Sequence, residues 1–73
     1  MSTKTQPGRF DCLAKLGPDE PYFVLRATDC LAAELVELWA IRARAGGTHI
    51  DKTRDAVDLA EEMRQWPKRK HPD

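Results

Sequence analysis

Two stretches of the sequence carry hydrophobic residues at helical spacing, and the first covers residues 29–45. Thr28 or Asp29 is a suitable N-cap for this stretch, and Gly46 with Gly47 ends it. Its hydrophobic positions form an arc wider than half of the helix circumference: Leu31, Ala32, Leu35, Val36, Leu38, Trp39 and Ala43. An arc this wide predicts contacts with more than one neighbouring element.

The second helical pattern covers residues 49–66. Thr48 followed by Asp51 resembles a capping box, Asp51 is an alternative cap, and Pro67 ends the pattern. Its hydrophobic arc contains Ile50, Ala56, Val57, Leu59, Ala60, Met63 and Trp66. The opposite arc contains Asp55, Asp58, Glu61 and Glu62. Because only a Gly-Gly break separates the two patterns, we expect an antiparallel helical hairpin.

The region before the helices favours extended structure. Residues 10–16 alternate between hydrophobic and polar positions, and residues 22–27 begin with aromatic and β-branched side chains. The turn-forming segment 17–21, which contains two prolines, separates them. The sequence therefore predicts an α+β fold in which a short N-terminal β-hairpin, or an extended segment, packs on the two helices.

Length and charge limit what this chain can be. It has 73 residues, with twelve Lys and Arg balancing twelve Asp and Glu. We expect one small domain over residues 9–66, a disordered arm over residues 1–8 and a basic tail over residues 67–73. A chain of this size buries only about 62% of its unfolded surface, which predicts a thin core that benefits from a partner subunit.

Composition also excludes several classes of protein. Zero net charge disfavours both a nonspecific nucleic-acid binder and an acidic DNA mimic. No stretch is apolar over the length of a membrane span, and the polar N-terminus does not resemble a signal peptide. We therefore expect a cytoplasmic protein with reduced thiols.

The residues that could carry chemistry are few. Cys12, Cys30, His49 and His71 lack the paired spacing of zinc ligands, so we expect neither a metal nor another cofactor. Cys30 lies in a predicted first helical turn, where a thiolate is stabilised. It is either a buried structural thiol, half of a disulfide with Cys12, or a reactive group that would need a nearby histidine. Enzyme activity is the weakest hypothesis.

Four residues are candidates for protein interaction. Trp39 and Trp66 are potential anchors of a homodimer, since tryptophan is frequent at interface hot spots. Arg42 lies within the hydrophobic arc, where it either extends its stem along the surface or forms an inter-subunit or anion contact. Arg26 either pairs with a neighbouring carboxylate (Glu20 or Asp29) or marks a functional edge.

An alternative function uses the basic C-terminal tail. Lys68, Arg69 and Lys70, together with Arg64 and Arg42, could contact nucleic acid and would do so in a salt-dependent way. No aromatic residue is interleaved with them to stack on bases, and a solubilising tail explains the same residues.

One segment of the sequence also resembles a known family, which implies an origin for the chain. The segment 19–29, Asp-Glu-Pro-Tyr-Phe-Val-Leu-Arg-Ala-Thr-Asp, resembles a family of small uncharacterised bacterial proteins found in phage and prophage contexts. The likeness continues through the tryptophan-bearing helix and the Ala-Gly-Gly break to the Glu-Met-x-x-Trp-Pro ending. This resemblance implies no reaction and assigns no catalytic residue. We expect a non-enzymatic interaction protein, an accessory factor of phage origin that self-associates.

Overall fold

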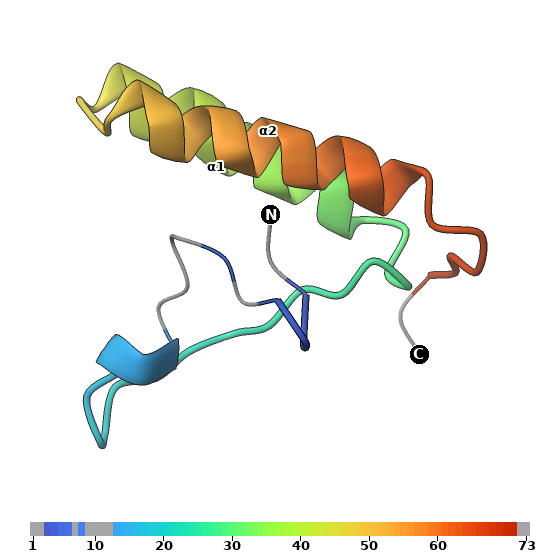
Figure 1. The fold of residues 1–73 in the computed structure, drawn as a ribbon, viewed down its shortest axis with the longest axis horizontal. Helices are drawn as coiled ribbons and strands as arrows, with labels where there is room; N and C mark the ends of the chain where they lie inside the picture. The colour runs from blue at the N-terminus through green and yellow to red at the C-terminus, as the bar shows by residue number, and fades with distance from the viewer. Residues whose placement is uncertain (1–2, 7, 9–12, 72–73) are drawn as a thin grey trace.

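Two antiparallel helices lying side by side dominate the computed structural model, which describes residues 3–6, 8 and 13–71 (Figure 1). Helix α1 spans Ala32–Ala45 and helix α2 spans Ile50–Arg64. A single 3-10 turn, η1, spans Leu13–Lys15. An extended segment runs from η1 beneath the helices to the start of α1 (Figure 1).

Hydrogen bonds define both ends of α1, through a side chain at its start and through the backbone at its end. The Asp29 carboxylate accepts a hydrogen bond of 2.8 Å from the N–H of Leu31, so its cap acts just before the regular helix. At the other end, the N–H of Gly46 donates to the Arg42 carbonyl, and that of Gly47 to the Arg44 carbonyl. Gly47 has a φ of 98°, a conformation that glycine adopts without steric cost and that turns the chain toward α2.

A histidine caps α2, which differs from both caps expected from the sequence. The Nδ1 atom of His49 accepts a hydrogen bond of 3.1 Å from the N–H of Asp51. Thr48, the predicted cap, instead donates its N–H to the Ala43 carbonyl across the turn. An unprotonated imidazole nitrogen thus takes the place of the usual hydroxyl or carboxylate oxygen.

Small side chains form the contact between the helices. The buried hydrophobic residues are Ala32, Ala33, Ala40, Ala56, Ala60 and Met63. Thr53 is buried beside them, and its hydroxyl donates to the Ile50 carbonyl at 3.0 Å. Alanine lets helix backbones approach closely, so few larger side chains enter the interface. The core is therefore thin, and most large hydrophobic residues lie outside it.

The predicted α+β class is wrong, because the described part of the chain is an all-helical hairpin without a β-strand. Of the first predicted strand, residues 10–12 lie outside the described residues, and Leu13–Lys15 form η1. Residues 22–26 form neither helix nor strand in the described structure, and Ala27 lies in a turn. Instead, Leu25 and Ala27 pack against the helical core. Tyr22, Phe23 and Val24, on which the strand prediction rested, are largely exposed instead. A two-stranded hairpin alone has little stability, so these residues form no ladder.

The C-terminal tail returns to the start of α1. The N–H of Cys30 donates to the Lys70 carbonyl, and the N–H of Lys70 donates to the Thr28 carbonyl, both at 2.8 Å. We call this pair of hydrogen bonds the tail bridge. It is the isolated parallel β-bridge between Asp29 and Lys70, and it ties together the open end of the hairpin.

Neither described helix is both long and apolar enough to cross a lipid bilayer.

Candidate functional site

The side of α1 that faces away from α2 is hydrophobic. It carries Leu31, Leu35 and Leu38, which we call the leucine face, with Trp39 on one flank and Ile41 on the other. These five side chains are between 40% and 67% exposed. Their exposure is unusual for a soluble domain, in which large contiguous apolar patches mark interaction sites.

The leucine face exists because the wide hydrophobic arc of α1 is used only in part. Ala32, Ala33 and Ala40 contact α2, and Val36 packs at the edge of the core. The extended segment adds Leu25 and Ala27 to the same core. The arc therefore meets two neighbouring elements, and its leucine side remains largely exposed to solvent.

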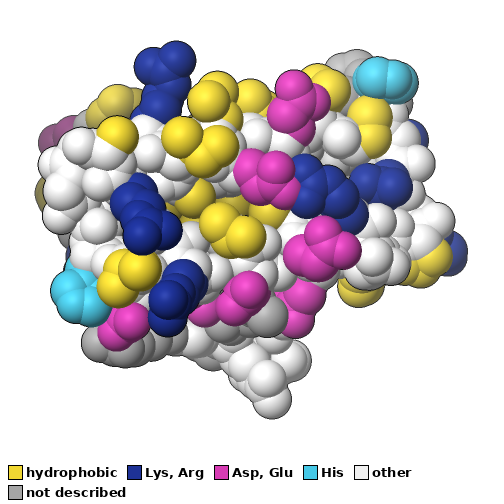
Figure 2. Space-filling model, turned by 90° about the horizontal axis from the view of Figure 1, so that it is seen from above, with side chains coloured by type: hydrophobic (Ala, Val, Ile, Leu, Met, Phe, Trp, Pro, Cys, Tyr) yellow, Lys and Arg dark blue, Asp and Glu magenta, His cyan; other side chains and the backbone are white. Residues whose placement is uncertain are grey.

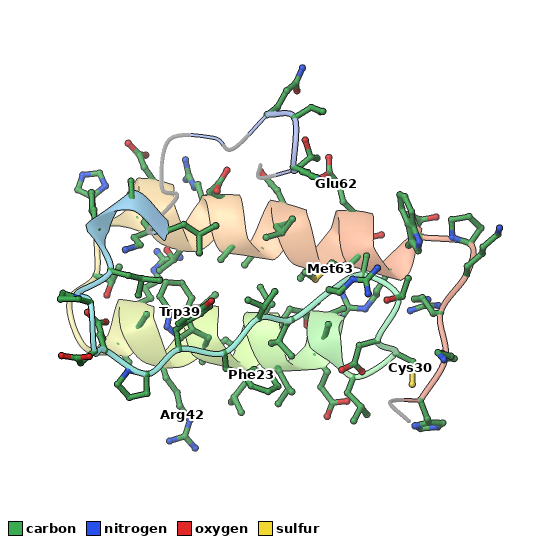
Figure 3. All side chains as sticks on the ribbon, turned by 90° about the horizontal axis from the view of Figure 1, so that it is seen from below. Phe23, Cys30, Trp39, Arg42, Glu62 and Met63 are labelled. Atoms are coloured by element: carbon green, nitrogen blue, oxygen red, sulfur yellow. The ribbon has the colours of Figure 1, made fainter. Side chains whose placement is uncertain are left out.

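Opposite charges lie at the two ends of the leucine face. Glu34 is in the first turn of α1 and Arg42 is in the last turn. Neither side chain forms an ion pair within the part of the chain that the structure describes. Arg42 points away from the helical hairpin (Figure 3). Both charges are thus available to groups outside the molecule.

The extended segment continues the exposed apolar surface beneath α1. Tyr22, Phe23 and Val24 are 60–84% exposed, and Phe23 lies where the segment passes α1 (Figure 3). Trp39 is nearby on α1, and the ammonium group of Lys52 lies 6.0 Å from the centroid of its ring. This distance allows a cation–π contact, which partly covers one face of the indole.

The outer side of α2 has the opposite character. Of the four acidic residues expected there, Asp58, Glu61 and Glu62 are exposed and Asp55 is half-buried. The hairpin therefore presents a hydrophobic side on α1 and an acidic, solvated side on α2. Of these two sides, the α1 side is closer in composition to the core of a protein interface.

Arg64, a candidate nucleic-acid contact, is engaged in joining the helices. Its guanidinium forms an ion pair with Glu37 of α1 and lies 3.6 Å from Glu61 on its own helix. The hydrogen bond from Arg64 holds the pKa of Glu37 below its ordinary value, and burial opposes this shift only in part. The same hydrogen bond raises the pKa of Arg64. Arg64 therefore has a structural role, because its ion pair with Glu37 links α2 to α1.

The other tail residues remain near the surface. Lys68 and Arg69 are exposed, whereas the backbone of Lys70 is fixed by the tail bridge. Trp66, a predicted dimer anchor, follows α2 and is 51% exposed. Trp39 lies within α1, whereas Trp66 lies two residues beyond the end of α2.

Arg26 is exposed on the extended segment, and no ion pair joins it to Glu20 or Asp29 in the described structure. Both carboxylates have backbone partners instead. Glu20 accepts from the N–H of Gly17 at 3.1 Å, and Asp29 caps Leu31. The predicted pairing of Arg26 is therefore absent from this part of the structure.

Sequence reasoning missed a contact between Cys30 and His71. The tail bridge brings the Cys30 Sγ atom to 3.4 Å from Nδ1 of His71, although 41 positions separate them. Cys30 is a half-buried free thiol, and the expected alternative of a disulfide with Cys12 involves a residue outside the described ones. Nothing in the spacing indicates this pair, because it depends on the return of the tail.

The chemistry open to this pair is limited. A cysteine beside a histidine can act as a nucleophile or contribute two ligands to a metal. Among the described residues, however, no third side chain is hydrogen-bonded to either group. Nor do three His, Cys, Asp or Glu residues gather there into a metal-binding group.

A shallow groove lies between the helices on the face opposite the extended segment. Figure 2 shows hydrophobic side chains in the middle of this face, with basic and acidic groups interspersed around them. The groove measures about 280 Å³, and its lining includes Ile41, Val57, Arg44 and Asp58. It lies at the lower limit of volumes typical for small-molecule sites.

No family model, curated protein or solved structure matches this chain. The resemblance to prophage-associated proteins therefore stays a prediction.

Proposed function

We propose that this chain is a small, non-enzymatic protein-interaction module that binds through the leucine face of α1. One observation carries the proposal: Leu31, Leu35 and Leu38 are 40–45% exposed on one side of a helix whose other side already fills the core. Complete burial of such a side chain contributes roughly 1.5–3 kcal/mol, and because these leucines are already more than half covered, a partner gains somewhat less than half of that amount at each.

The basic tail supports the nucleic-acid alternative less well. Arg64 is paired with Glu37 and Glu61, and the backbone of Lys70 is held by the tail bridge. The outer side of α2 adds exposed acidic groups that would repel a phosphate backbone. Protein binding is the better supported function.

Site-specific photo-cross-linking tests the proposal in cells that produce the full chain. The variant Leu38→p-benzoylphenylalanine places the reactive group on the leucine face, and Asp58→p-benzoylphenylalanine places it on the acidic side of α2 as a matched control. We expect Leu38, and not Asp58, to form a discrete adduct whose second component is a protein identified from its peptides. No adduct, or equal adducts from both positions, would contradict the proposal.

A further inference from the structure

We infer that the occupant of the leucine face is a second copy of this chain, bound through an antiparallel contact between the two α1 helices. This inference rests on the proposed function and names the partner of the same surface. Three observations support it: the surface area of the chain, the spacing of the leucines and the arrangement of charge along α1.

The area argument concerns how much surface the single chain leaves exposed. Its accessible surface is 6132 Å², whereas a compact folded protein of the same mass exposes about 4,600 Å². The extended segment accounts for part of the excess of roughly 1,500 Å². A standard interface buries roughly 800 Å² on each partner, so one such contact would remove about half of this excess. The net charge of zero means that two copies do not repel each other overall.

The leucine spacing suits a pairing of helices. Leu31, Leu35 and Leu38 are separated by four and three positions, the alternation that places side chains along the seam between two packed helices. Arg42 occupies the next position of the same row. Its aliphatic stem can continue the apolar seam while its guanidinium reaches the edge of the interface.

The charges select the direction of pairing. In a parallel contact, Glu34 would lie beside the partner's Glu34, and Arg42 beside the partner's Arg42. In an antiparallel contact centred near Leu35 and Leu38, each Arg42 comes within about one helical turn of the partner's Glu34. Opposite charges then meet twice around the two-fold axis, and the helix dipoles also oppose each other favourably.

Sedimentation velocity of the purified full chain, from low to high micromolar concentration, tests this inference. We expect a dimer for the wild type and a monomer for Leu38→Glu. Glu34→Arg and Arg42→Glu should each weaken dimerisation roughly tenfold, because each reversal replaces two attractive pairs with two repulsive ones. The double variant Glu34→Arg/Arg42→Glu should recover to within about threefold of the wild type, since both pairs return with inverted sign.

Controls separate the interface from folding and from general charge effects. Asp58→Arg reverses an exposed charge on α2 and should leave dimerisation unchanged. Each reversal also opposes the dipole of α1, since Glu34 is in its first turn and Arg42 in its last, so circular dichroism checks that each variant is folded before its dimerisation is compared with that of the wild type. The charge effects should shrink at about 0.5 M salt.

The failures are distinguishable. A wild type that stays monomeric at high micromolar concentration overturns the second copy as occupant, and an identified foreign protein cross-linked at Leu38 would then leave the proposed function standing. A dimer that survives Leu38→Glu overturns the leucine face as its interface. A double variant that does not recover overturns the antiparallel pairing.

Discussion

The ion pair between Glu37 and Arg64 shows how one contact at the residue scale links the two helices. Its hydrogen bond lowers the pKa of Glu37, so the folded state binds a proton on this carboxylate less readily than the unfolded chain does. The resulting stabilisation is present above the unfolded pKa, near 4.5, and is lost as pH falls through the lower folded pKa. The pair therefore makes the hairpin less stable as the pH falls below the ordinary pKa of a glutamate.

Replacing Glu37 tests this coupling. We expect Glu37→Gln to lower the thermal unfolding midpoint at neutral pH and to show less further loss than the wild type on acidification to about pH 3. The measurement is thermal unfolding followed by circular dichroism across this pH range. Glu62 is an exposed carboxylate on α2, so the control variant Glu62→Gln should keep the wild-type profile. Parallel profiles for Glu37→Gln and the wild type would argue against the role of the pair.

Residue-scale prediction from the sequence was uneven. The helical pattern placed Trp39, Arg42 and Trp66 on hydrophobic arcs, yet all three are exposed. The roles of Arg64 and Cys30 depend on partners from distant segments, Glu37 and His71. Spacing along one helix carries no information about such partners, so these contacts could not be predicted.

At the scale of elements, the turn between the helices depends on which glycine has a positive φ. Gly47 has a φ of 98°, whereas Gly46 has an ordinary negative φ of −84°. A Cβ atom at Gly46 would meet the Arg42 carbonyl oxygen at 3.5 Å, an ordinary contact distance. The two adjacent glycines thus have different functions in the same turn.

A pair of matched variants distinguishes them. Gly47→Ala should reduce the free energy of unfolding by about 1–2 kcal/mol, because a Cβ atom is strained at positive φ. Gly46→Ala should be neutral or stabilise the protein by up to about 1 kcal/mol through the lower entropy of its unfolded chain. Urea denaturation of both variants measures the difference. Equal effects at the two positions would contradict the assigned backbone roles.

The elements themselves were only partly predictable. The helical period and the Gly-Gly break indicate both helices, whose regular parts begin at Ala32 and Ile50. The sequence could not show that alanines would suffice for the helix contact and leave Leu35 and Leu38 exposed. The second strand was mispredicted because only Leu25 and Ala27 of this segment pack, and they pack on the helical core, whereas Tyr22, Phe23 and Val24 are exposed.

At the scale of the whole molecule, the tail bridge makes the C-terminus part of the fold. We expect removal of residues 69–73 to speed hydrogen exchange of the Cys30 amide roughly tenfold, since its acceptor, the Lys70 carbonyl, is lost. The full-length variant Arg69→Ala/Lys70→Ala keeps the backbone and should keep the protection. If both proteins lose the protection, the charges of the tail, and not its backbone, stabilise the start of α1; if both keep it, the tail bridge does not protect this amide.

The two ends of the hairpin differ in how much chain they enclose. Contacts next to Gly46 and Gly47 close short loops, and each further contact between α1 and α2 adds little loop-closure entropy. The tail bridge between Asp29 and Lys70 encloses the whole hairpin and closes last. We therefore expect folding to start at the turn and to proceed toward the bridged end. Local unfolding should follow the reverse order, with Leu31 and Cys30 losing their order before the centre of the helix pair does.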